Sequence, residues 1–303
     1  MEAPLPVKKV MLRQALKRFI YSTFESIWSF GFRIAGGRNP LKGSQTFQRV
    51  GGSPKQVVIV APHPDDETIG AGGVAALHRQ NGDTVIAVIV TDGSGSRAGG
   101  LKKEEMSKQR HQEMQAAAKI LDIEFRWLGL PEGEWRVQEA EKQLSPLLKN
   151  ADLIYAPSCI DFHPEHLRVA RVAASLVNEK HIIRAFELGV PLTSILANVV
   201  IDISSAASQK ERALDAFETQ SGAIYSLKRI SRYRAAFYKV PVVEVFWQMT
   251  GKAYRSLVAT GDWKKIANCP YRGIRSRPFS DPLAYLTGRK ERRRLVQLLN
   301  AKH

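Results

Sequence analysis

The sequence predicts an α/β fold, a layered, Rossmann-like and mostly parallel sheet with helices on both faces. Continuous apolar runs of strand length alternate with longer segments of helical periodicity, and glycines or polar turns separate them. Strands that alternate with helices pair in parallel through right-handed crossovers, and their burial on both faces removes the polar alternation of a half-exposed strand. The 303 residues, 44% of them hydrophobic, are enough to bury a full core.

The individual elements follow from these runs and from the turn residues between them. We expect strands at 57–61, 84–91, 123–128, 153–157 and 196–203. We expect helices at 69–80, 102–121, 139–148, 167–177 and 206–219.

Two segments flank this core. Residues 8–34 carry an apolar stripe from Leu12 to Trp28 with basic residues away from it, which is typical either of a helix in a membrane interface or of a helix packed on its own domain. After residue 250 the pattern weakens and arginines stand among prolines and glycines. We therefore predict an N-terminal amphipathic helix and linker at 1–54, an α/β domain at 55–250, and a basic C-terminal extension at 251–303.

The composition narrows the class of partner. A formal net charge of +16 favours a phosphorylated or lipid-linked substrate, an anionic membrane surface, or nucleic acid. Nucleic acid is the weakest of these, because no helix-turn-helix, zinc-finger or RNA-recognition signature is present. Two distant cysteines and the lack of a spanning or signal-like apolar stretch lead us to expect a cytoplasmic protein, with peripheral membrane contact as an open alternative.

A charged turn follows the first expected strand. It places His63, Asp65 and Asp66 at the carboxyl edge of the sheet, where open α/β folds bind ligands. His63 and Asp66 can reach one metal ion together, which leaves the Asp65 carboxylate for proton transfer. A second loop, residues 161–166, follows the strand at 153–157 and opens on the same edge with two histidines. A tetrahedral catalytic zinc needs three protein ligands, so we expect this loop to supply the third.

With these two loops, the sequence resembles the PIG-L/LmbE-like zinc-dependent N-acetylglucosaminyl deacetylases. The resemblance spans roughly residues 55 to 250 and rests on Ala61-Pro62-His63-Pro64-Asp65-Asp66-Glu67, Gly70-Ala71-Gly72-Gly73, Thr91-Asp92-Gly93, Arg110 with Glu113, His163-Pro164-Glu165-His166, and Lys210 with Ala213-Leu214 and Thr219-Gln220.

The resemblance implies a role for each residue of the two loops. His63, Asp66 and His166 would hold Zn²⁺, and Asp65 would be the general base. A protonated His163 would stabilise the tetrahedral intermediate. The implied reaction removes the N-acetyl group from an N-acetylglucosamine-type conjugate, and a lipid- or diphosphate-linked sugar is among the candidate substrates.

The sequence departs from the family pattern at two places. Glu165 stands where the family often has an Asp that would orient an imidazole, and residues 217–220 read Phe-Glu-Thr-Gln instead of His-x-Ser-Gln. The second change concerns substrate contacts and leaves the metal ligands unaffected. Arg97, in the loop after the second strand, is a candidate donor to sugar hydroxyls or phosphate, and a solvated loop arginine is an equal alternative.

Three other readings stay open. Gly70-x-Gly72-x-x-Ala75 imitates a dinucleotide fingerprint, but eight residues separate it from the strand, so an NAD-dependent oxidoreductase is disfavoured. Two histidines and one carboxylate also bind iron in non-haem oxygenases, which makes Fe²⁺ an alternative metal. A non-catalytic saccharide- or membrane-binding protein could retain the fold, although the intact set of His63, Asp65, Asp66 and His166 argues against it.

Overall fold

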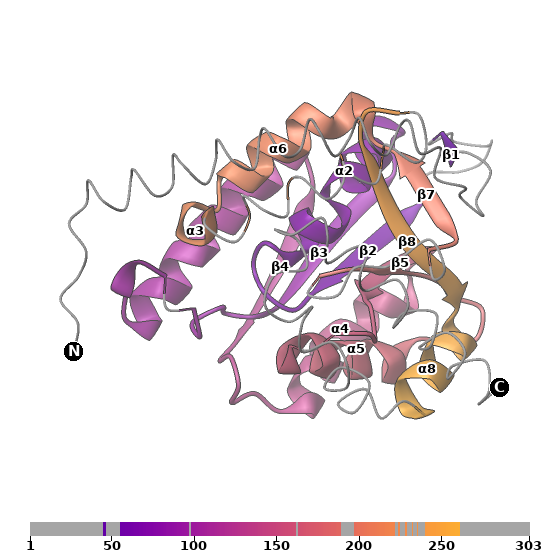
Figure 1. Cartoon of the computed structure of the whole chain (residues 1–303). Coiled ribbons are helices and arrows are strands. Elements are labelled where there is room, and N and C mark those ends of the chain that lie inside the picture. The colour runs from indigo at the N-terminus through magenta and orange to yellow at the C-terminus, as the bar shows by residue number, and fades with distance from the viewer. Residues whose placement is uncertain are drawn as a thin grey trace, which may run out of the picture.

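A computed structural model of the chain describes residues 45–46, 55–96, 98–161, 163–188, 197–221 and 240–260, together with residues 224, 228, 232 and 235. In this part of the chain the expected α/β architecture is confirmed (Figure 1). The strands are β1 (Gln45–Thr46), β2 (Gln56–Ala61), β3 (Thr84–Thr91), β4 (Glu124–Leu130), β5 (Leu153–Pro157), β6 (Ile182–Phe186), β7 (Val199–Asp202) and β8 (Val243–Thr250). The α-helices are α2 (Asp66–Gln80), α3 (Lys103–Leu121), α4 (Val137–Lys149), α5 (Pro164–Leu176), α6 (Ala207–Asp215) and α8 (Gly251–Thr260).

The strands form one sheet in the order β1-β7-β8-β6-β5-β2-β3-β4. Every pair is parallel except the two made by β8, which runs antiparallel to both β6 and β7. The sheet is therefore mostly parallel, as expected. Because β2 lies directly between β5 and β3, the loops that follow these three strands open side by side at one edge.

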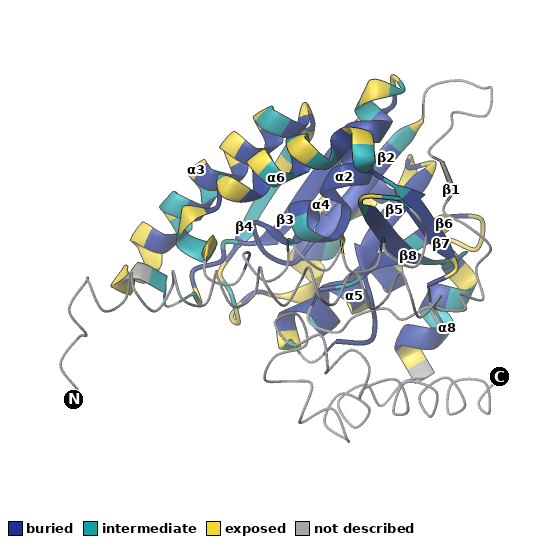
Figure 2. Ribbon diagram, turned by 45° about the horizontal axis from the view of Figure 1, so that its top comes forward, coloured by how far each residue is buried: buried dark blue, intermediate teal, exposed yellow. Residues whose placement is uncertain are grey.

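The core has two layers, one on each face of the sheet. Helices α2, α3 and α6 cover one face, and α4, α5 and α8 cover the other (Figure 1). Strand β2 shows the consequence, because Val58 and Val60 pack in one layer while Val57 and Ile59 pack in the other. Burial on both faces explains why this strand reads as a continuous apolar run, and in Figure 2 the central strands β2 and β3 are buried except at their first residues.

Helix α2 packs very closely on the sheet, and its glycines permit this approach. A Cβ at Gly70 would lie 2.2 Å from Phe186 Cδ2, and one at Gly73 would lie 2.5 Å from Ile203 Cδ1. The buried carboxylate of Glu244 accepts hydrogen bonds from the backbone N–H groups of Gly73 at 2.7 Å and Val74 at 2.9 Å. These contacts fix the helix whose first turn carries charged residues of the site, and they give Gly70 and Gly73 a packing role.

The two flanking segments lie mostly outside the described residues. The N-terminal helix expected at 8–34 and the arginines beyond residue 260 belong to this part of the chain. Helix α8 was not expected; it packs against α5, and Tyr254 donates a hydrogen bond of 2.8 Å to the carbonyl of Pro157 at the end of β5. Among the described helices, none has the length and apolar character to cross a membrane.

Candidate metal centre

The structure brings the two histidine loops together. His63 lies in the turn between β2 and α2, whereas His163 and His166 lie where the loop after β5 enters α5. The ring centroids are 4.9 Å apart for His63 and His163, 5.2 Å for His63 and His166, and 4.5 Å for His163 and His166. Parallel pairing of β2 with β5 causes this convergence, because it sets the ends of the two strands next to each other.

The three residues expected to hold the metal have donor atoms at suitable distances. Asp66 Oδ2 lies 3.0 Å from His63 Nδ1 and 3.5 Å from His166 Nε2. A tetrahedral zinc with bonds of about 2.0–2.2 Å needs ligand atoms about 3.3–3.6 Å apart. All three residues are buried. Nitrogen and carboxylate donors with this spacing fit a zinc ion, and they also suit other first-row divalent metals.

A second carboxylate lies behind each of the two histidines. Asp161 Oδ2 is 3.0 Å from His166 Nδ1, and Glu132 Oε1 is 3.4 Å from His63 Nε2. Metal-binding histidines are commonly oriented in this way through the ring nitrogen that does not face the metal. The arrangement leaves His166 Nε2 and His63 Nδ1 directed toward Asp66.

Glu165 does not orient an imidazole, so this expectation was wrong. Its carboxylate instead accepts a hydrogen bond of 2.5 Å from Trp135 Nε1 and lies 3.7 Å from the guanidinium of Arg168. From the sequence we did not assign the orienting role to Asp161. Its position two residues before His163, in the same loop, could have indicated it. Glu132 carried no such signal, because its contact with His63 depends on the pairing of strands.

The electrostatics concentrate positive charge around Asp66. Burial lowers the pKa of His63, but the hydrogen bond with Asp66 and the nearby carboxylate of Glu132 outweigh this effect and raise that pKa to about 10. Burial raises the pKa of Asp66, yet the charge of His166 and the hydrogen bond with His63 bring it far below its ordinary value. The Asp66 carboxylate therefore favours positive charge at both neighbouring imidazoles, and a metal ion bound there would replace their protons.

His163 is the third histidine of the group and differs from the other two. One donor atom from each of His63, His163 and His166 can be chosen so that all three lie within 4.8 Å of one another. Burial, and then the charges of His166 and His63, lower the pKa of His163 to about 4. This shift favours the neutral ring, whereas the resemblance implies a protonated one. Its Nδ1 is buried and has no hydrogen-bond partner among the described residues.

Asp65 is held by a buried arginine from helix α3. Arg110 Nη2 lies 3.0 Å from Asp65 Oδ2, and the same guanidinium donates hydrogen bonds to the carbonyls of Pro64 and Gly93. Asp65 has a φ of 115°, a backbone conformation that is costly for a residue with a Cβ. Burial raises the pKa of its carboxyl to about 7, while the charge of Arg110 acts in the opposite direction. Arg110 belongs to the motif set out above, but its partner could not be deduced from the sequence.

We expect that Gly93→Ala will disturb this arrangement. Gly93 has a φ of +66°, and a Cβ there would lie 2.7 Å from Arg110 Nη1. Gly100 is a matched control, because its φ is +70° and nothing lies within 4 Å of its Cβ position. Both substitutions should carry the cost of a positive φ, about 1–3 kcal/mol, but only Gly93→Ala adds a steric conflict. Urea unfolding should show a larger loss of stability for Gly93→Ala; equal losses would mean that Arg110 moves aside freely.

Two remaining expectations concern the substrate side of the site. Arg97 lies outside the described residues, so its role stays a prediction. The departing sequence at 217–220 still makes specific contacts. The backbone N–H and hydroxyl of Thr219 bind the Glu113 carboxylate at 2.9 and 2.7 Å, and Gln220 Nε2 donates to Ser96 Oγ at 3.0 Å. This segment therefore supports the loop after β3.

The part of the chain that carries this site is similar in sequence to known proteins. The sequence profile of the family described as PIG-L, GlcNAc-PI de-N-acetylase, matches residues 58–177. The chain is 29% identical over 185 residues to the probable N-acetyl-alpha-D-glucosaminyl L-malate deacetylase 2 of Bacillus subtilis, a match that covers 55% of this chain and 84% of that one.

Solved structures extend the likeness to the fold. The N,N'-diacetylchitobiose deacetylase of Pyrococcus horikoshii superposes with a TM-score of 0.57 at 24% identity, over 66% of this chain and 85% of that chain. The 4-carboxy-2-hydroxymuconate hydratase GalB of Pseudomonas putida gives 0.56 at 18% identity, over 64% and 96%. At these identities the superpositions show a shared fold only, and the two enzymes catalyse different reactions. The sequence match is more specific: the profile of the PIG-L family matches residues 58–177, which carry the histidine site, and the resemblance expected from the motifs is confirmed.

Proposed function

We propose that this chain is a metal-dependent hydrolase that removes the N-acetyl group from an N-acetylglucosamine-type conjugate. One observation carries the proposal: His63, Asp66 and His166 present donor atoms at metal-ligand spacing, and the adjacent Asp65 carboxylate is held by Arg110 outside that set. A hydrolase needs such a free base, whereas the ligand set alone would also suit an iron oxygenase. The match to a family of de-N-acetylases and the name of the Bacillus subtilis relative support the amide as substrate.

His63, Asp66 and His166 would hold the metal, with Zn²⁺ as the first candidate and Fe²⁺ as the alternative. When bound at such a site, zinc lowers the pKa of water to about 7 and polarises a carbonyl. Elemental analysis of protein purified without oxygen would identify the ion, and a redox-active metal with no hydrolysis would favour the oxygenase.

The chain's own residues would move the protons. Asp65 accepts a proton from the attacking water and returns it to the leaving nitrogen, while Arg110 keeps the carboxylate directed at the site. His163 donates an N–H to the developing oxyanion. A neutral imidazole has one such proton, so this role does not require the ring to be protonated. Loss of one oxyanion donor typically costs about 100- to 1,000-fold in rate.

The proposal is tested by release of free amine from a panel of N-acetylhexosamine conjugates. The panel should include sugars linked to lipid diphosphate, to inositol, to a small organic acid and to a second sugar. We expect one class to be hydrolysed well above the others by the metal-loaded chain. If no member releases amine while saccharides still bind, the chain is a non-catalytic binding protein that has kept the fold.

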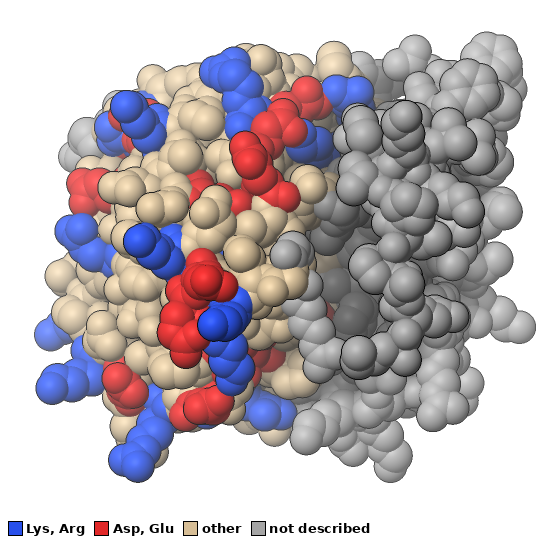
Figure 3. All heavy atoms as spheres, turned by 90° about the vertical axis from the view of Figure 1, so that its left-hand side faces the viewer, with Lys and Arg blue, Asp and Glu red and all other residues tan. Residues whose placement is uncertain are grey.

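We further propose that the substrate is lipid-linked and that the protein is cytoplasmic and meets an anionic membrane peripherally. The distribution of charge supports this proposal. Residues 1–54 and 261–303 contain 20 Lys and Arg against 5 Asp and Glu, whereas residues 55–260 contain 25 against 24. The α/β core is nearly neutral, and both signs are interspersed over the part of it seen in Figure 3. The positive charge thus belongs to the flanking segments, where each basic residue near an anionic surface contributes about 1 kcal/mol.

Flotation with liposomes tests the membrane proposal. We expect the full chain to float with vesicles that contain phosphatidylserine at low salt and to be released by high salt, because the attraction is screened. A variant with the arginines at 292–294 replaced by glutamine should float less. If the full chain floats neither with anionic nor with neutral vesicles at low salt, peripheral membrane contact is excluded.

A further inference from the structure

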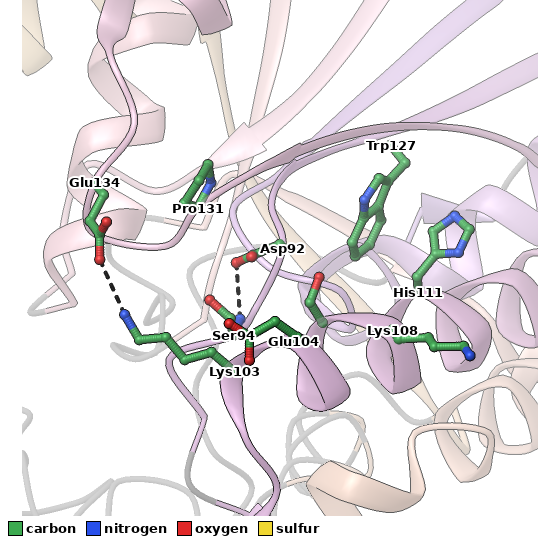
Figure 4. Close-up of a pocket in the computed structure, with 10 residues that line it drawn as sticks. Asp92, Ser94, Lys103, Glu104, Lys108, His111, Trp127, Pro131 and Glu134 are labelled. Carbon is green, nitrogen blue, oxygen red and sulfur yellow. Dashed lines mark hydrogen bonds and ion pairs between the residues drawn. The ribbon is translucent and has the colours of Figure 1, made fainter.

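A groove of about 610 Å³ lies beside the candidate metal centre, at the edge of the sheet formed by β4 (Figure 4). Its walls are the amino-terminal half of α3 and the loops after β3 and β4. The side chains that line it include Asp92, Lys103, Lys108, His111, Trp127 and Glu134. A volume of this size is sufficient for one or two small rings. None of the roles proposed above uses this space.

The groove and the metal centre share a wall. Asp92 Oδ1 accepts hydrogen bonds from the backbone N–H groups of Ser94 at 3.0 Å and Glu132 at 3.1 Å, which joins the two loops. The carboxylate of Glu132 then accepts the N–H of Gly95 at 3.0 Å and reaches His63 on the other side. The metal centre and the groove are therefore connected through the same pair of loops.

The side chains of the groove suit a sugar ring. Trp127 is half-buried, and His111 meets its indole edge-on with centroids 4.7 Å apart and an angle of 72°. No described residue accepts a hydrogen bond from Trp127 Nε1. The mouth is bridged by Lys103 Nζ and Glu134 Oε1 at 3.1 Å, and these two exposed side chains can reorient at little cost. A pyranose offers an apolar C–H face to an aromatic ring and hydroxyls to the donors and acceptors around it.

The charges of the groove argue against an anionic ligand. Three carboxylates, from Asp92, Glu104 and Glu134, face two ammonium groups, from Lys103 and Lys108. A phosphate would meet net repulsion here, whereas a neutral ring with several hydroxyls can bond to groups of both signs.

We propose that this groove is a second saccharide subsite, which binds a neutral sugar ring attached to the N-acetylated sugar at the metal centre. The proposal rests on the function proposed above for the metal centre, but it concerns a separate surface. It makes Trp127 the stacking platform and gives the chain a preference for substrates with at least two rings.

The test compares the β-1,4-linked disaccharide of N-acetylglucosamine with the monosaccharide. Binding is measured calorimetrically on the metal-loaded full chain carrying Asp65→Asn, so that turnover does not consume the ligand. We expect Trp127→Ala to weaken disaccharide binding about 10-fold relative to monosaccharide binding, the usual size of an aromatic contact, and Trp127→Phe to restore most of it. In the active chain, the ratio of kcat/KM for the disaccharide to that for the monosaccharide should fall correspondingly.

Two further variants keep the result interpretable. Ser107→Phe should fill the groove from α3 and weaken disaccharide binding while Trp127 stays in place. This variant therefore tests the groove even if Trp127→Ala does not fold. Phe125→Ala is the matched control, because Phe125 lies on the same strand and packs in the same layer as Trp127 but does not line the groove. Equal disaccharide affinity in the parent, Trp127→Ala and Ser107→Phe would overturn the subsite. Loss of binding in these variants without any deacetylation by the parent would instead overturn the proposed reaction and leave the groove as a saccharide site.

Discussion

Replacing Asp65 by Asn is expected to lower turnover by about 100- to 10,000-fold, the usual range for loss of a general base. The amide keeps the size of the side chain and can still face Arg110, but it cannot accept the proton of the attacking water. The metal ligands are untouched, so metal content should stay near that of the parent. Amine release and elemental analysis on the same preparation separate the two effects.

Glu67 is the residue that could replace Asp65 in this role. It is buried, and burial raises the pKa of its carboxyl to about 7. Its oxygens, however, already accept hydrogen bonds from the backbone N–H of Asp65 at 3.1 Å and from the Thr68 hydroxyl at 2.5 Å. We therefore expect Glu67→Gln to be less harmful than Asp65→Asn. Activity of Asp65→Asn close to that of the parent, with a deep loss in Glu67→Gln, would make Glu67 the base.

The second large effect is expected from His166→Ala, which should sharply weaken metal retention. Two ligands hold an ion poorly, and the substitution also leaves the buried carboxylate of Asp161 without its imidazole partner. Asp161→Asn should give a graded result, a loss of about 10- to 100-fold in metal affinity, because it disturbs the orientation of the ring without removing a ligand. Competition with a chelating dye measures both affinities.

His181→Ala is the control for the loss of a histidine. His181 is buried next to Asn178 at the start of β6, away from the carboxyl edge of the sheet, and should retain metal like the parent. Tight, stoichiometric metal binding by His166→Ala would remove His166 from the ligands. In that case His63 and His163 would have to provide the nitrogens of the site.

The predictable part of the fold is the part buried on both faces. Strands β3 and β5 have the predicted bounds and β2 differs by a single residue, because complete burial yields an uninterrupted apolar run. Strands β6 and β8 were not predicted. Each contains polar residues, such as Arg184 and Glu244, whose partners are supplied by distant parts of the chain. Local sequence cannot show that Glu244 lies beneath helix α2. A charged residue at this position therefore led us not to predict a buried strand.

The same distinction applies to the site. The convergence of His63, Asp66 and His166 was predictable, because their loops follow strands of a parallel sheet and such loops share an edge. The contacts that hold these residues were not predictable. Arg110 reaches Asp65 across 45 positions of sequence, and it can do so only because Gly93 leaves room for its side chain. Outer contacts of this kind depend on how helices pack on the sheet, which no motif encodes.

Reconstitution of the metal-free chain tests the central claim most directly. The full chain is freed of metal with a chelator and titrated with Zn²⁺, while amine release from its best N-acetylated sugar is followed. We predict that activity rises linearly from near zero and stops at one ion per chain, and that the Asp65→Asn variant binds the same amount of metal with little activity. Full amine release by the metal-free chain, or by Asp65→Asn, would contradict the claim that this site hydrolyses an amide with one bound metal and an aspartate base.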